Sequence, residues 1–234
     1  MYPITFDTTK TQLHINTFIR SVYNWMAIGL AITGLMAYYV AHSEVLLGIV
    51  FGNRLVFFGL IIGELTLVFS LARRIGRMRA STATGLFLLY SALNGITLSA
   101  VLLIYTRESL SATFFIAAVT FLACSIFGMS TKRDLTSLGG FMTMGLIGIL
   151  IASVVNLFIG SSGIRMIISY IGVIVFVGLT AYDTQKLKAM AMSQPAGLDG
   201  GIVRKGAVVG ALTLYLDFIN LFLMLLYILG GSRE

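Results

Sequence analysis

Apolar residues dominate the chain in seven long runs, and charged or turn-forming residues separate the runs. Each run approaches the roughly 20 helical residues that cross a hydrocarbon core of about 30 Å. The runs do not alternate apolar and polar positions, as the strands of a transmembrane β-barrel do. The pattern predicts an all-α, polytopic membrane protein with seven transmembrane helices in a single domain, residues 1–234. The expected spans are residues 22–41, 55–72, 83–105, 112–129, 138–160, 166–182 and 207–229.

The composition agrees with this class of protein. Hydrophobic residues make up 58% of the chain and charged residues 11%, less than half of the roughly 25% that is usual in a soluble domain. The segment before the first run, about residues 1–21, is polar, so we expect a short tail there rather than a cleaved signal peptide. The segment 192–201, with Pro195 and clustered glycines, is the most mobile connection that the sequence predicts.

The positive charges fall mostly on one side of the predicted membrane. Threading the chain through seven spans puts 12 lysines and arginines on the side of the N-terminus and 4 on the other. By the positive-inside rule, the N-terminus is cytoplasmic and the C-terminus lies outside. The net charge of +7 therefore reflects the orientation of the chain in the membrane. We expect anionic lipid headgroups as a partner, and no nucleic acid.

Three acidic residues lie within the predicted spans or at their edges, namely Glu64, Asp183 and Asp217. A charge buried in the membrane without a partner is costly, so each acid needs a proton, a hydrogen bond or a function. Asp217 lies about 15 Å along the last span, near the middle of the bilayer. It is either an acid that holds helices together or a proton or cation site. Glu64 has the same two interpretations, as a pathway residue or as a structural hydrogen-bond partner.

The two aspartates lie on consecutive antiparallel helices and could meet in the cytoplasmic half of the membrane. A depth scale taken from the neighbouring lysines separates them by roughly 13 Å. They meet if the sixth span sinks deeper, or if the last span begins as a helix outside the bilayer. Span 2 ends on the same side with Arg73 and Arg74, and an arginine can bind a carboxylate bidentately. Gly59 and Gly63, like Gly206 and Gly210, have the four-residue spacing that favours close helix packing.

The motifs AYDTQ at 181–185 and LTLYLDFINLF at 212–222 resemble the Bax inhibitor-1 family, and the resemblance covers nearly the whole chain. It implies a last helix surrounded by the other six and a pH-sensitive calcium leak in a bacterial inner membrane. It also implies that Asp183 and Asp217 share a proton and bind calcium transiently, without a cofactor. An arginine at the end of the second span, here Arg73 or Arg74, would act as a latch on the pair.

Two other functions compete with a calcium leak. The chain could be an interaction protein that regulates other membrane proteins, such as a membrane-bound quality-control protease, with the N-terminal tail as its handle. An intramembrane aspartyl protease also places aspartates on two successive helices, but its Gly-x-Gly-Asp and Pro-Ala-Leu motifs are missing here. The sequence contains no nucleotide-binding loop and no nucleophile with an adjacent base. We therefore expect no enzymatic activity.

Overall fold

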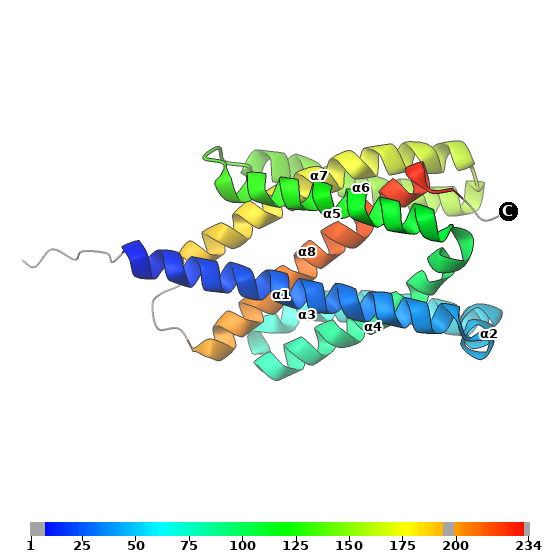
Figure 1. Cartoon of the computed structure of the whole chain (residues 1–234), viewed down its shortest axis with the longest axis horizontal. Coiled ribbons are helices and arrows are strands. Elements are labelled where there is room, and N and C mark those ends of the chain that lie inside the picture. Colours follow the sequence, from blue (N-terminus) through cyan, green and yellow to red (C-terminus); the bar gives the residue numbers. More distant parts are fainter. Residues whose placement is uncertain (1–7, 194–198, 232–234) are drawn as a thin grey trace, which may run out of the picture. The chain divides into compact units, whose positions relative to one another are not determined.

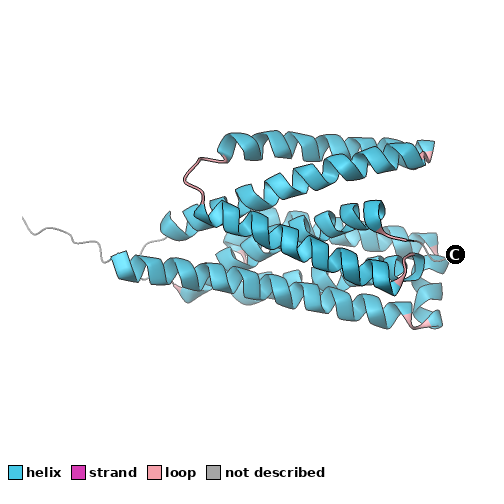
Figure 2. Ribbon diagram, turned by 45° about the horizontal axis from the view of Figure 1, so that its top comes forward, coloured by secondary structure: helices cyan, strands magenta, loops and turns pink. Residues whose placement is uncertain are grey.

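The computed structural model of the chain describes residues 8–193 and 199–231. In this part of the chain the regular elements are all helices, joined by short loops (Figure 2). The elements are α1 (Thr8–Ala41), α2 (Glu44–Gly52), α3 (Arg54–Arg74), the 3-10 turn η1 (Ile75–Arg77), α4 (Ala80–Ile104), α5 (Arg107–Ser130), α6 (Thr136–Ile159), α7 (Ser162–Ser193) and α8 (Gly200–Leu229).

Seven of these helices are long and apolar enough to cross a membrane: α1, α3 with η1, and α4 to α8. This confirms the predicted all-α, polytopic membrane fold. The helices extend beyond the predicted apolar runs, because their polar ends remain helical. α7 continues eleven residues past position 182, and α8 begins seven residues before position 207. The connection expected to be mobile was 192–201; its ends belong to α7 and α8, and residues 194–198 lie outside the described residues.

Two features of the N-terminal region differ from the sequence pattern. The helix α1 begins at Thr8, so most of the segment expected as a polar tail is helical, and residues 1–7 lie outside the described residues. The short helix α2 was not predicted, because its nine residues fall well short of a span. Its N-cap is Ser43, whose hydroxyl accepts the backbone N–H of Leu46 at 3.4 Å. Asn53 caps α3 in the same way, accepting from Leu55 N at 2.9 Å.

The chain divides into two compact units. The first comprises residues 1–99 and 187–212, and the second comprises residues 100–186 and 213–234. Both α7 and α8 therefore contribute to both units. The single membrane domain expected for residues 1–234 stays a prediction.

In the first unit, small residues bring α1 and α4 close together (Figure 1). The Thr33 hydroxyl donates to the carbonyl of Ser91 at 2.8 Å. A Cβ added to Gly95 would lie 2.5 Å from the carbonyl oxygen of Thr33. By contrast, Gly59 and Gly63 on α3 have no neighbouring atoms within 4 Å of a Cβ position among the described residues. The close packing predicted from their spacing is wrong, because both face away from neighbouring helices.

In the second unit, α7 packs against α5 and α6. Gly128 of α5 contacts the backbone carbonyl of Ala181, and Gly139 of α6 contacts the ring of Tyr182. Phe218 of α8 packs edge to face with Phe114 of α5, with ring centroids 5.5 Å apart. Glycine at the helix contacts allows backbones to approach closely in a membrane, where packing drives association. These contacts hold the segment of α7 that immediately precedes Asp183.

Candidate functional site

Asp183 on α7 and Asp217 on α8 both belong to the second unit, and their side chains are hydrogen-bonded to each other. α7 continues ten residues beyond Asp183, and α8 begins seventeen residues before Asp217. Both acids therefore lie well inside their helices. The expected offset in depth of roughly 13 Å took Lys186 and Lys205 as markers of one membrane level, and both lysines lie within helices, in α7 and α8.

The hydrogen bond between the two carboxyl groups has a chemical requirement. Ionised carboxylates only accept hydrogen bonds, so one of the two groups must carry a proton for the bond to form. Asp217 is 5% exposed, and its Oδ2 atom is buried without a hydrogen-bond partner among the described residues. Asp183 is half-buried. The arrangement can store one proton between the two helices, and losing it would leave two adjacent anions in a poorly solvated place.

Lys186 supplies positive charge close to this pair within the same unit. Lys186 lies one helical turn after Asp183 and interacts with it electrostatically. Its ammonium group is 5.9 Å from the centroid of the Tyr182 ring. Because Lys186 is exposed, water screens much of its attraction for the carboxylate. The pair therefore has an exposed cation at its edge and a buried oxygen at its centre.

The neighbours of Asp183 on α7 tie the helix to α5 and to the loop between α5 and α6. Thr184 is buried and donates to the hydroxyl of Ser125 on α5 at 3.5 Å. The amide of Gln185 donates to the carbonyl of Arg133 at 2.8 Å and accepts the N–H of Leu135 at 2.9 Å. No role had been predicted for these positions. The motif AYDTQ could have indicated contacts at Thr184 and Gln185, because every residue after its alanine is polar or amphipathic.

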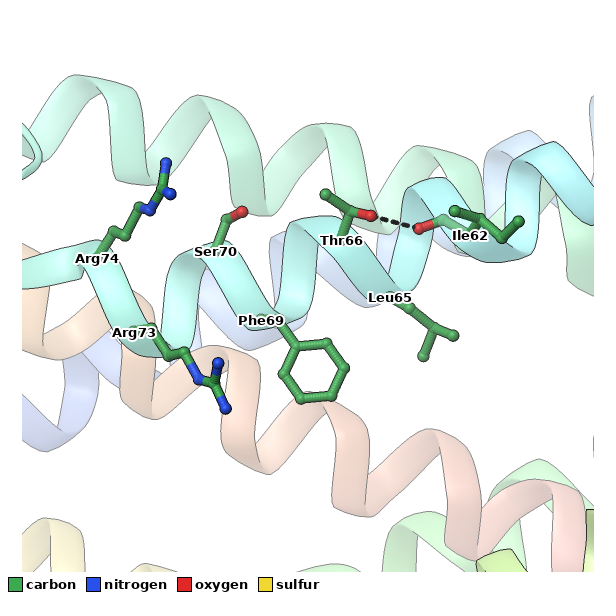
Figure 3. Close-up of a pocket in the computed structure, with 7 residues that line it drawn as sticks. All are labelled: Ile62, Leu65, Thr66, Phe69, Ser70, Arg73 and Arg74. Carbon is green, nitrogen blue, oxygen red and sulfur yellow. Dashed lines mark hydrogen bonds between the residues drawn. The ribbon is translucent and has the colours of Figure 1, made fainter.

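The latch candidates Arg73 and Arg74 lie at the end of α3, in the first unit. Figure 3 shows their side chains diverging from α3. The guanidinium group of Arg73 lies 5.8 Å from the centroid of the Phe69 ring. A contact between either arginine and the aspartate pair stays a prediction.

Glu64, on the same helix, has partners on α4. The Thr97 hydroxyl donates to its Oε1 atom, and the Asn94 side-chain amide donates to Oε2 at 3.5 Å. Both carboxylate oxygens of this half-buried acid therefore have hydrogen-bond donors on a neighbouring helix of the first unit, as a structural role requires. A role of Glu64 in an ion pathway stays a prediction. Among the described residues, no group of three or more histidines, cysteines or acids is placed to hold a metal ion. Two carboxyl groups fall short of the six to eight oxygen ligands of a stable calcium site.

Known proteins resemble the chain along nearly its full length. Residues 15–234 match the family described as "Inhibitor of apoptosis-promoting Bax1". The inner membrane protein YbhL of Escherichia coli (strain K12) is 47% identical over 232 residues, covering 99% of each chain. A protein of Borreliella burgdorferi is 46% identical over 232 residues, covering 97% of this chain and 99% of its own. A protein of Deinococcus radiodurans is 42% identical over 234 residues, covering 100% of this chain and 98% of its own.

Proposed function

Since the chain belongs to the Bax inhibitor-1 family of membrane proteins, we propose that it is a pH-sensitive calcium leak channel gated by Asp183 and Asp217. The observation that carries the proposal is the hydrogen bond between these two side chains, on consecutive spans. Ionisable groups inside a membrane protein commonly mark ion or proton pathways. The proposed activity is transport and involves no enzymatic step or cofactor.

In the proposed closed state, one shared proton joins the two carboxyl groups and holds α7 and α8 together. The groups titrate as a coupled pair, so the proton leaves the pair rather than either residue alone. Its loss replaces a hydrogen bond with repulsion between two anions, which is strong where the surroundings are poorly polarisable. In the proposed open state, the arginine latch at Arg73 or Arg74 releases the pair and α3 moves. Calcium suits the resulting path because it prefers carboxylate and carbonyl oxygens.

We place the protein in the bacterial inner membrane, because its relative from E. coli carries that description. The excess of basic residues on one side supports a cytoplasmic N-terminus and an outer C-terminus. Cysteine labelling tests this topology in a Cys124→Ser background. An impermeant maleimide should label Ser162→Cys in intact spheroplasts and should label Ser130→Cys only after lysis. The opposite pattern would reverse the orientation.

Calcium flux into proteoliposomes, followed with an enclosed calcium dye across a range of pH, tests the proposed gate. The unchanged protein should show flux that varies with pH. Asp183→Asn and Asp217→Asn should each flatten this dependence, because an amide cannot exchange the shared proton. Asp134→Asn, an exposed position in the same unit, is the control and should keep the pH profile. If both variants of the pair kept it too, the aspartates would not be the gate.

A further inference from the structure

One exposed side of α3 carries a long groove, here called the α3 groove, with a volume of about 540 Å³. It extends along the helix from Ile62 to Arg74. Two rows of side chains at four-residue spacing border it, one ending at Arg73 and the other at Arg74 (Figure 3). The stretch containing α3 is the least buried of the seven candidate spans, with 6% of its most apolar window buried. This side of the helix is therefore available to lipid.

The wall of the groove towards its outer end is apolar. Ile62, Leu65 and Phe69 are 63%, 53% and 57% exposed. The hydroxyl of Thr66 donates to the carbonyl of Ile62 at 2.7 Å (Figure 3), so this polar group is already satisfied within the helix. The distance from Ile62 to Arg73 along the axis is about 17 Å at about 1.5 Å per residue. That length is close to half of a hydrocarbon core of about 30 Å, so the groove matches a single leaflet.

The other end of the groove is strongly basic. Arg73 and Arg74 are exposed, and within their own unit neither is ion-paired with a described acidic residue. Arg77 follows one turn later, and the ammonium group of Lys205 donates to the carbonyl of Gly76 at 3.4 Å. Guanidinium groups bind phosphate oxygens through charge-assisted, often bidentate hydrogen bonds. A groove about one leaflet long, with apolar side chains beside the hydroxyl groups of Thr66 and Ser70, ends at two guanidinium groups. This lining matches the shape and charge of an acidic phospholipid.

We propose that the α3 groove binds one acidic phospholipid, with an acyl chain along Ile62, Leu65 and Phe69 and the headgroup phosphate at Arg73 and Arg74. The binding site is a property of the first unit and does not depend on the calcium leak or on the aspartate pair. It also gives the two arginines a ligand other than the proposed latch. Basic clusters at the cytoplasmic ends of membrane helices attract anionic lipids in this way.

Native mass spectrometry of the full chain, released from detergent in the presence of added lipid, tests the proposal. Phosphatidylglycerol should bind in preference to phosphatidylcholine with the same acyl chains. Combining Arg73→Gln with Arg74→Gln should raise the apparent Kd for phosphatidylglycerol by about tenfold or more, since two charge-assisted hydrogen-bonding groups are lost. The control combines Arg54→Gln with Arg107→Gln, which removes the same charge at the other ends of spans and should leave the Kd unchanged. Equal Kd values in the two double variants would overturn the site.

Two further experiments distinguish binding of a whole lipid from binding of a phosphate group alone. Thr66→Trp should weaken binding while both arginines remain, because the indole fills the apolar part of the groove. Soluble glycerol phosphate should not displace the lipid at matched concentration, because it lacks the chain that the groove accommodates. Undiminished lipid binding by Thr66→Trp, or displacement by glycerol phosphate, would show a phosphate site without a lipid groove and would overturn the proposal. Circular dichroism and size-exclusion chromatography verify that each variant remains folded.

Discussion

The side chain of Gln185 accepts the backbone N–H of Leu135 at 2.9 Å, which fastens α7 to the start of α6. The same amide donates to the carbonyl of Arg133 at 2.8 Å, so both of its functional groups are used. The loop between α5 and α6 thus sets the axial position of α7 two residues from Asp183. The first acid of the pair is positioned by a segment about fifty residues away in the sequence.

Replacing Gln185 with alanine should lower the free energy of unfolding by about 1–3 kcal/mol. The change leaves one backbone N–H and one carbonyl without their partner at a partly buried place. Thermal or denaturant unfolding of the detergent-solubilised protein measures the loss. Met192→Ala, on the same helix at a 58% exposed side chain, is the control and should change stability little. If the two variants unfolded alike, the loop would not depend on this amide.

Two adjacent glycines of α6 should respond in opposite directions to alanine. A Cβ on Gly139 would overlap the ring of Tyr182, whereas a Cβ on Gly140 meets no described atom within 4 Å. Gly139→Ala should therefore destabilise the protein by about 1–3 kcal/mol through overpacking. Gly140→Ala should be neutral or stabilising by up to about 1 kcal/mol, because alanine is the better helix former. Unfolding curves of the two variants compare them directly, and equal shifts would contradict the contact.

Asp134 should titrate below the ordinary aspartate pKa of 3.8. The hydroxyl of Thr136 and then its backbone N–H, which donates to Oδ1 at 2.8 Å, lower the pKa of this exposed carboxyl group. A lowered pKa means that the contact stabilises the folded chain above pH 3.8, and that the stabilisation is lost as the pH falls through the lowered value. Carbon-detected NMR of aspartate-labelled protein in micelles measures the midpoint.

The variant Thr136→Ala tests the cause of this shift. Removing the hydroxyl should move the midpoint of Asp134 back towards 3.8, although the backbone hydrogen bond remains. Thr131→Ala is the matched control, since the hydroxyl of Thr131 accepts from the backbone N–H of Arg133 in the same loop at 3.2 Å. That variant should leave the midpoint of Asp134 unchanged. An unchanged midpoint of Asp134 in Thr136→Ala would mean that the hydroxyl does not lower the pKa.

Glu64 offers a test of the ion pathway that is separate from the gate. An amide at this position keeps one oxygen, which can still accept from Thr97, but it loses the second oxygen, which accepts from Asn94, and the negative charge that attracts a cation. Glu64→Gln should therefore lower calcium flux several-fold at every pH without changing the shape of the pH profile. The proteoliposome assay measures both quantities. Unaltered flux, with Thr97→Val destabilising the protein, would assign Glu64 to helix packing alone.

The close contacts between helices were predictable from the residue spacing only in part. Gly59 and Gly63 have the spacing of a packing motif but contact no other helix among the described residues, whereas Gly210, which has the same spacing from Gly206, lies against Leu187 and Val22; Gly95, Gly128 and Gly139 contact other helices without belonging to either pair. Spacing along one helix indicates which residues share a face, but the partner of that face depends on the arrangement of the other helices. In the same way, the sequence predicted only that Asp183 and Asp217 could meet, whereas the structure gives the hydrogen bond between them.

The sequence by itself determined the class of the protein, its seven spans and the small set of acids that a membrane must accommodate. These features follow from the length and composition of local segments. Every span must match the thickness of the bilayer, and every charge buried in the bilayer raises the free energy unless it is neutralised or paired. Only the tertiary structure decided that Asp183 bonds to Asp217, that Glu64 bonds to α4, and that Gln185 anchors a loop. Each of these contacts joins residues that are far apart in the chain, so its distance and direction depend on how whole helices pack.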